Sequence, residues 1–138
     1  MLIELGVPGG RTGVRDDAQR EAVLAAIARW PSTIELAGIE LYEGVLQGET
    51  KVREFLKSAV DTTRELIAQD KIARKPALLS GAGAAWYDVV ADEFAKVNSK
   101  DIEVVLRPGC YLTHDVGIYI PEPDRAISRR KKAGGFSG

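Results

Sequence analysis

Several residue types that build common functional sites are scarce in this chain of 138 residues. It contains a single cysteine, Cys110, which excludes an internal disulfide and favours a reducing compartment. It also contains a single histidine, which argues against a classical zinc cluster. The chain is therefore expected to reach stability through a hydrophobic core rather than through cross-links or a structural metal.

An excess of charge of one sign is also missing. Lys and Arg total 19 against 20 Asp and Glu, so the formal net charge of -1 gives no overall field to attract nucleic acid or an anionic membrane. No apolar run approaches the length of a membrane span, and the first residues lack the basic segment of a secretion signal. These absences predict a cytoplasmic protein with neither a nucleic-acid partner nor a membrane partner.

What is present is the composition of one globular domain, with 45% hydrophobic and 28% charged residues. Short apolar runs predict four strands, at residues 1–7, 34–42, 77–80 and 102–106. Apolar residues at helical spacing predict three helices, at residues 16–30, 52–69 and about 84–97. Asp16 followed by Gln19 is typical of a capping box at the start of the first helix. Beyond these, residues 111–120 are predicted to be extended.

The repeated order of strand, loop and helix predicts parallel strands joined by right-handed crossovers. No G-x-G-x-x-G motif follows the first strand, and each strand ends in its own polar or glycine-rich loop. This pattern favours consecutive units of a (β/α)₈ barrel over a Rossmann sheet. A whole barrel takes about 250 residues. The expected fold is therefore α/β, a partial barrel with about four parallel strands alternating with three helices.

The stretch around Gly81 and Gly83 is a candidate anion site. A strand that runs into glycines and then into a helix presents bare backbone N–H groups and the positive end of a helix dipole, which suit a phosphate or carboxylate. The alternative is that both glycines only allow the chain to turn sharply. The other strand ends decide between these interpretations.

Four segments, in this order, resemble the later barrel strands of fold-type III pyridoxal-phosphate enzymes: GVPGGRTGVR, GIELYEG, LLSGAGAAWYDVV and LRPGCYLTHDVGIY. Within these enzymes they are most similar to the D-threonine aldolase and D-serine dehydratase (amino acid deaminase) group, relatives of alanine racemase. The resemblance covers residues 2–119. It implies that residues 1–120 form the second half of a barrel that binds pyridoxal phosphate, and that residues 121–138 form a polar, basic, disordered tail.

The resemblance implies roles for residues at the strand ends. Arg11 matches an arginine that points at the phenolic oxygen of the cofactor or at the substrate carboxylate, a task that suits the fixed fork of a guanidinium. Tyr42 matches an aromatic residue or histidine that lies against the pyridine ring. An arginine in a solvated loop and a tyrosine in the core are the alternatives.

The same resemblance assigns the phosphate end of the cofactor. The segment from Ser80 through Gly81 and Ala82 to Gly83 matches the phosphate-binding turn, and a helix starting near residue 84 would aim its N-terminus at the phosphate. The anion-site interpretation of the turn thereby becomes the preferred one.

In the R-P-G strand end, Gly109 and Tyr111 would complete the phosphate cup. Arg107 would approach the ring nitrogen in some members, and its role stays open. For Cys110 a small buried residue is preferred over a reactive thiol. For His114 and Asp115 a polar pair at a strand end is preferred over an acid–base or metal pair.

Two features of the family are missing from the sequence. Its Schiff-base lysine lies in an R-P-H-x-K-T-like segment at the end of the first barrel strand, and no such segment occurs here. The C-terminal β domain, which holds a divalent metal in some full-length members, has no counterpart either. We therefore expect a fragment that carries the phosphate side of the site, has little or no turnover alone, and tends to form homo-oligomers through an open sheet edge.

A complete enzyme of this group would act on a D-amino acid, as a dehydratase or as an aldolase. GCYLTHD and GVPGGRTGVR are more similar to the deaminase branch. Two alternatives remain at the level of sequence. One is a stand-alone small α/β phosphate-binding or regulatory module without catalysis, and the other is a doubly wound enzyme unrelated to pyridoxal phosphate.

Overall fold

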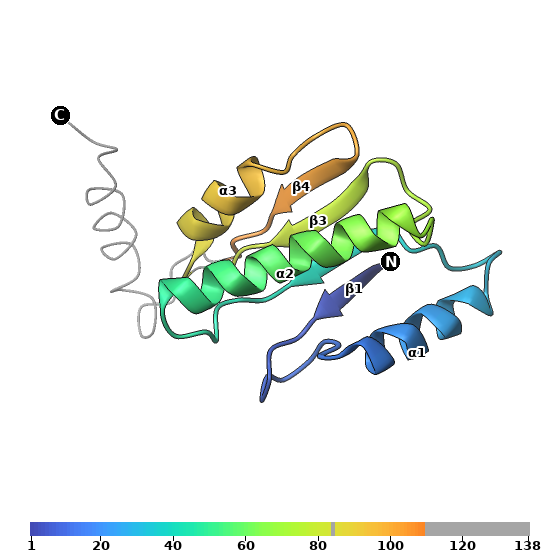
Figure 1. Cartoon of the computed structure of the whole chain (residues 1–138), viewed down its shortest axis with the longest axis horizontal. Coiled ribbons are helices and arrows are strands. Elements are labelled where there is room, and N and C mark those ends of the chain that lie inside the picture. The colour runs from blue at the N-terminus through green and yellow to red at the C-terminus, as the bar shows by residue number, and fades with distance from the viewer. Residues whose placement is uncertain (84, 110–138) are drawn as a thin grey trace.

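Strands and helices alternate strictly in the computed structural model, which describes residues 1–83 and 85–109 (Figure 1). In chain order the elements are β1 (Leu2–Leu5), α1 (Asp17–Ala28), β2 (Gly38–Leu41), α2 (Glu49–Ala68), β3 (Ala77–Gly81), α3 (Tyr87–Ala95) and β4 (Ile102–Leu106). The predicted α/β fold of four strands and three helices is confirmed. The extended segment predicted at 111–120 and the domain boundary predicted at residue 120 lie outside the described residues.

The four strands form one sheet in the order β1-β2-β3-β4, and every neighbouring pair is parallel. Each strand lies next to the preceding one and extends the sheet in the same direction. Right-handed crossovers therefore place all the connecting helices over one face of the sheet. Figure 1 shows α2 lying across this face, with α1 and α3 to either side. A doubly wound sheet reverses its strand order partway, and these four strands show no reversal. The arrangement is that of consecutive βα units of a barrel, as predicted.

The hydrophobic core lies between the sheet and α2. One row of register-paired residues crosses the sheet, and within it Ile39 and Leu79 are fully buried. From α2 comes a stripe of buried residues with helical spacing: Val52, Leu56, Ala59, Val60, Thr63 and Leu66. Each large aliphatic side chain buried in this way contributes about 1.5–3 kcal/mol. The apolar periodicity that predicted this helix thus marks the face that holds it to the sheet.

The opposite face of the sheet is more polar. Successive side chains of a strand point to opposite faces, so a second row of paired residues faces away from the helices: Glu4, Glu40, Ser80 and Val105. Glu4 accepts a hydrogen bond from Thr12 Oγ1 at 2.6 Å. In a closed barrel this face is the interior. The polar side chains of this row therefore lie where a barrel would hold its inner layers.

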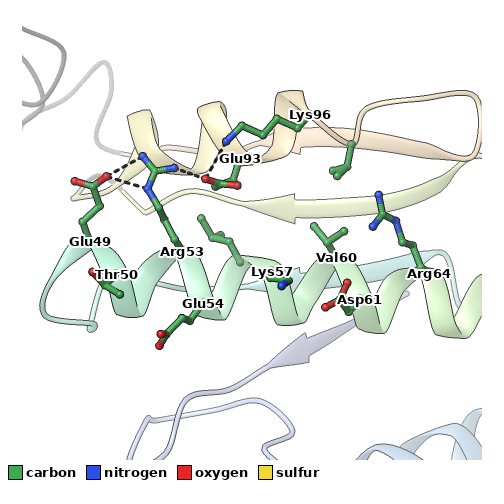
Figure 2. Close-up of a pocket in the computed structure, with 12 residues that line it drawn as sticks. Glu49, Thr50, Arg53, Glu54, Lys57, Val60, Asp61, Arg64, Glu93 and Lys96 are labelled. Atoms are coloured by element: carbon green, nitrogen blue, oxygen red, sulfur yellow. Dashed lines mark hydrogen bonds and ion pairs between the residues drawn. The ribbon is translucent and has the colours of Figure 1, made fainter. Parts of the chain in front are cut away.

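A groove of about 640 Å³ runs between α2 and α3 (Figure 2). Its apolar lining consists of Leu56, Val60 and Val97, and its other lining residues are mostly charged. Lys57 and Arg64 stand beside Glu54 and Asp61 along α2, as Figure 2 shows. Because both signs alternate along the groove, it presents no field of one sign to a ligand.

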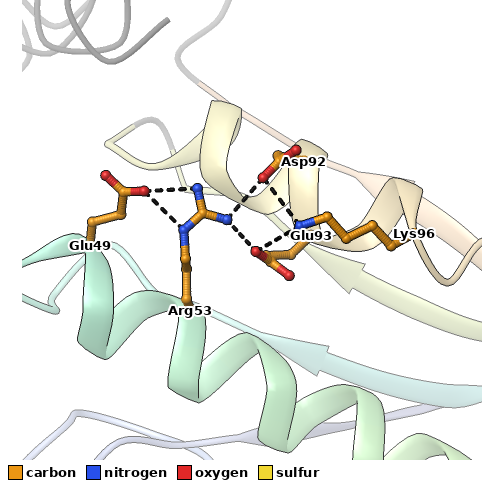
Figure 3. Close-up of polar contacts among 5 residues, drawn as sticks. All are labelled: Glu49, Arg53, Asp92, Glu93 and Lys96. Atoms are coloured by element: carbon orange, nitrogen blue, oxygen red, sulfur yellow. Dashed lines mark hydrogen bonds and ion pairs between the residues drawn. The ribbon is translucent and has the colours of Figure 1, made fainter. Parts of the chain in front are cut away.

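An ionic network joins α2 to α3 across one end of this groove (Figure 3). Arg53 of α2 donates to Glu49 at 2.9 Å, to Asp92 at 2.9 Å and to Glu93, and Lys96 donates to Glu93 at 3.0 Å. The hydrogen bond from Arg53 lowers the pKa of Asp92. Exposed ion pairs of this kind contribute less than about 1 kcal/mol each to stability. The main effect of the network is therefore on the orientation of α3 relative to α2.

The predicted start of the first helix is confirmed, whereas the predicted second strand is too long. Asp16 Oδ1 accepts a hydrogen bond from the Gln19 amide at 2.7 Å and caps α1. The carbonyl of Trp30 accepts from the amides of Thr33 and Ile34 at 3.0 and 2.9 Å, which holds this part of the chain in a turn. A backbone amide bonded in a turn cannot join a sheet ladder, so the predicted start at Ile34 is wrong; β2 runs from Gly38 to Leu41.

Gly38 permits a very close approach of β2 to β3, so a larger residue at this position is expected to destabilise the sheet. Its φ is 154°, and a Cβ atom there would lie 1.9 Å from the carbonyl oxygen of Leu78. We expect Gly38→Ala to lower the free energy of unfolding in urea by about 3 kcal/mol or more, because the strands must separate. Gly48→Ala is the control. Gly48 also has a positive φ, of 91°, but nothing lies within 4 Å of its Cβ position, so a loss of about 1–2 kcal/mol is expected. Equal losses would contradict this account.

Candidate functional site

The carboxyl ends of β2, β3 and β4 meet at one edge of the sheet, and Arg107 connects them. It follows β4 directly, and its backbone amide extends the ladder by donating to the Gly81 carbonyl at 3.0 Å. The guanidinium reaches back across the strands. Its Nε donates to Ser80 Oγ at 3.1 Å, and its Nη2 donates to Glu40 Oε2 at 2.6 Å and to the Leu41 carbonyl at 3.3 Å. One arginine therefore joins residues of all three strand ends, as its long fork permits.

Tyr42 lies at the same edge, directly after β2. It is 40% exposed and does not belong to the hydrophobic core. Its ring packs against two glycines: a Cβ atom at Gly83 would lie 2.7 Å from Tyr42 Cε2, and a Cβ atom at Gly44 would lie 2.6 Å from the Tyr42 hydroxyl oxygen. Both glycines are thus needed to make room for this ring. An exposed aromatic ring at a strand end can stack on a flat ligand.

The turn after β3 is shaped by close packing as much as by backbone freedom. A Cβ atom at Gly81 would lie 3.2 Å from the Phe94 ring of α3. The residue with the unusual backbone is Ala82, whose φ is 84°, rather than either glycine. Non-glycine residues in this conformation cost free energy and concentrate at functional sites. Backbone freedom is therefore not the reason for glycine at positions 81 and 83, since neither has a positive φ. Both are glycine because a Cβ atom there would crowd a neighbouring aromatic ring.

Glu43 is the residue of this site that the sequence did not reveal. It is completely buried, and its Oε1 accepts a hydrogen bond from the Gly83 amide at 2.6 Å. Its Oε2 is also buried and has no hydrogen-bond partner among the described residues. Burial raises the pKa of Glu43, against the opposing effects of nearby backbone amides and of Arg107. The available signal was an acidic residue placed directly after an apolar strand, between Tyr42 and Gly44.

The helix after this turn starts later than predicted. α3 begins at Tyr87, with Trp86 as its N-cap, rather than near residue 84, which itself lies outside the described residues. The Gly83 amide is bonded to the Glu43 carboxyl, so the chain here is held against β2 instead of entering the first helical turn. The expected phosphate cradle therefore differs from the prediction in two respects: one of its amides is already occupied, and its helix lies further along the chain.

Arg11 is not joined to this cluster by any contact among the described residues. It is exposed in the loop between β1 and α1. The arginine that organises this loop is Arg15, whose Nε donates to the Val7 carbonyl at 3.1 Å and whose Nη2 donates to the Gly10 carbonyl at 2.6 Å. The predicted cofactor role of Arg11 stays a prediction, and Arg15 is the arginine that bonds to the carbonyls of this loop.

The last segment of the predicted site is only partly described. Gly109 has open space around its Cβ position, with nothing within 4 Å. Tyr111 lies outside the described residues, as do Cys110, His114 and Asp115. Of the predicted cofactor-binding residues, the structure thus brings together Tyr42, Ser80, Gly81, Ala82, Gly83 and Arg107.

Three further features are missing from the part of the chain that the structure describes. No lysine there stands at the carboxyl edge of the sheet: the lysines lie on α2, between α2 and β3, or after α3. No group of three or more His, Cys, Asp and Glu residues is arranged to hold a metal ion. Within the same residues, none of the helices has both the length and the apolar character that crossing a membrane requires.

Comparison with known proteins does not assign the chain to a family. No protein-family model matches it, and no curated protein sequence gives a significant match. A functional proposal therefore has to rest on the residues of the strand ends and on their geometry.

Replacing the two loop arginines separates their roles. We expect Arg15→Ala to lower the free energy of unfolding by about 1 kcal/mol, because its hydrogen bonds to the Val7 and Gly10 carbonyls are lost. Arg11→Ala is the matched control, with an expected change within about 0.5 kcal/mol. Chemical denaturation of both variants provides the measurement. A larger loss for Arg11→Ala than for Arg15→Ala would refute this assignment.

The buried carboxyl of Glu43 predicts a pH dependence of stability. Because folding raises its pKa above the ordinary value of 4.5, the folded protein binds this proton more tightly than the unfolded chain does. The stabilisation is complete below about pH 4.5 and is lost as the pH rises through the folded-state pKa.

Glu43→Gln removes this titration. As the pH rises from about 4 to about 8, we expect Glu43→Gln to become more stable relative to the unsubstituted protein, because only the unsubstituted protein loses stability as Glu43 ionises. Urea denaturation at a series of pH values measures the difference. Glu54→Gln, at an exposed position of α2, controls for net charge. A difference that stays constant over this range for Glu43→Gln would show that Glu43 does not titrate as a buried group.

Proposed function

We propose that this chain carries the cofactor-binding edge of a cytoplasmic pyridoxal-phosphate-dependent lyase that acts on D-amino acids. The supporting observation is that Arg107 binds Ser80 Oγ at 3.1 Å at the carboxyl ends of adjacent parallel strands, with the exposed ring of Tyr42 at the same edge. These residues come from three of the four segments that resemble the fold-type III enzymes. Active sites of barrel enzymes lie at this edge of the strands.

The donors present at this edge fit a phosphate-bearing aromatic cofactor, with one exception. The Ser80 hydroxyl accepts from Arg107, so its own hydrogen remains available to donate. Arg107 brings a positive charge, which Glu40 partly balances. Tyr42 offers a ring face for stacking. The exception is the Gly83 amide, which Glu43 already occupies.

Pyridoxal phosphate, when bound, supplies an electron sink for bonds at the α-carbon of an amino acid. The residues of this chain would hold and orient it: Ser80 and the turn through Ala82 on the phosphate side, and Tyr42 against the ring. Arg107 would provide a cation to the ring side or to the phosphate. Whether the α-proton or the Cα–Cβ bond is lost, as in a dehydratase or an aldolase, depends on groups beyond these.

The proposed binding is noncovalent. No lysine among the described residues stands at the strand ends, so these residues offer no group there to form a Schiff base. We propose that it binds the cofactor without turnover and that a complete site needs a further strand carrying the lysine, together with a divalent metal in metal-dependent relatives. The two edge strands of the described sheet, β1 and β4, would be the places where homo-oligomers form.

Mixing the full chain with pyridoxal phosphate tests the proposal. We expect a shift of the cofactor absorbance band and no borohydride-trapped adduct at the strand ends, because binding there is noncovalent. Arg107→Gln should weaken binding by about tenfold through the loss of one charged hydrogen-bond donor. Arg64→Gln, at an exposed position of α2, is the control for net charge and should bind as the unsubstituted chain does.

Two outcomes would contradict the proposal. The absence of any shift of the band at high cofactor concentration would remove the cofactor assignment and favour a module that binds another ligand. A trapped adduct at a residue of this edge would contradict the inference that the site lacks a Schiff-base lysine.

A further inference from the structure

The turn predicted to bind an external anion already holds a carboxyl group of the protein itself. Glu43 Oε1 lies 2.6 Å from the Gly83 amide nitrogen, a short distance for a hydrogen bond from a backbone amide. Glu43 is completely buried, so this contact is not one of many positions of a mobile surface side chain. The bond joins the end of β2 to the loop after β3, across 40 residues of sequence.

The backbone around this carboxyl group provides what an anion requires. Burial has the largest effect and raises the pKa of Glu43, while the backbone amides of Glu43 itself, Gly83 and Ala82 and the positive charge of Arg107 favour its charged form. Ala82 is held at a φ of 84°, the strained point of the turn that presents these amides. Short turns of this kind form concave sets of N–H groups that bind anions.

The second oxygen of Glu43 shows that its bonding is incomplete. Oε2 is buried and has no hydrogen-bond partner among the described residues. A buried carboxylate normally has partners for both oxygens, because leaving one without a partner is costly. Glu43 thus fills the turn with one oxygen bonded and the other without a partner among the described residues, which is weaker bonding than a permanently fixed carboxylate would have.

We propose that Glu43 is an internal occupant of this anion site and that a phosphate group binding at the turn must displace it from the Gly83 amide. The inference rests on the proposed function only for the identity of the natural ligand, since inorganic phosphate tests the site itself. Glu43 thereby sets the affinity of the site. It keeps the turn in shape when no ligand is bound, and it competes with the ligand by like charge and by occupying the same donor.

Replacement of Glu43 separates these two effects. Glu43→Ala removes both the charge and the hydrogen bond to Gly83, whereas Glu43→Gln removes only the charge. Asp61→Asn makes the same change of charge at an exposed position of α2 and serves as the matched control. Because Glu43→Ala leaves a buried space and can fail to fold, Glu43→Gln alone is sufficient for the test.

The measurement is a titration of the isotope-labelled full chain with inorganic phosphate at about pH 8, followed through the Gly83 amide resonance. We expect phosphate to shift this resonance in Glu43→Gln at a concentration about tenfold lower than in the unsubstituted protein, and lower still in Glu43→Ala. Asp61→Asn should behave as the unsubstituted protein does. Affinities within about twofold across all four proteins, or no shift of Gly83 in any of them, would overturn the inference.

A parallel titration with pyridoxal phosphate distinguishes this inference from the proposed function. If inorganic phosphate binds more tightly to Glu43→Gln but the cofactor band shifts in no protein, Glu43 is the internal occupant and the cofactor assignment fails. If the cofactor binds equally to the unsubstituted protein and to Glu43→Gln, the proposed function stands and Glu43 does not compete.

Discussion

The parallel pairing of four strands in sequence order is the constraint on which the rest of this structure depends. Since β1 to β4 are added to one side of the sheet in turn, right-handed crossovers place the helices on a single face and α2 supplies the core. The same geometry brings the carboxyl ends of all the strands to one edge. Arg107, Ser80 and Glu40 meet there although 67 residues separate the first from the last in sequence. The cluster of residues at this edge therefore follows from the topology rather than from any local motif.

At this edge two chemical requirements compete for the same backbone. If the turn binds a ligand as proposed, it also has to keep its shape when the ligand is absent, and unpaired buried amides are costly. Glu43 resolves this conflict by accepting from Gly83, at the expense of a buried carboxyl group whose pKa is raised. The Tyr42 ring, packed on Gly83 and Gly44, closes the other side of the turn. The result is a preformed turn whose donor is held by an internal group.

The sequence allowed more of the fold than of the site to be predicted. Apolar periodicity located α2, and Asp16 with Gln19 located the start of α1, because both signals are local. The second strand was predicted to start too early because the Trp30 carbonyl holds the amides of Thr33 and Ile34 in a turn, which an apolar run does not indicate. The start of α3 was placed too early because the partner of the Gly83 amide, Glu43, lies 40 residues away. The role of Arg15 was not predicted, because nothing in the loop sequence shows which guanidinium folds back onto the carbonyls.

The sequence by itself determined the order of strands and helices, the parallel architecture and the set of residues at the strand ends, because each follows from spacing along the chain. Only the tertiary structure decided which of those residues touch. It placed Arg107 against Ser80 and Glu40, left Arg11 exposed, and assigned Gly81 and Gly83 to close packing rather than to backbone freedom. It also brought Glu43 into the turn. The physical reason is that hydrogen bonds across a sheet edge depend on register and burial, which are properties of the folded chain and not of any one segment.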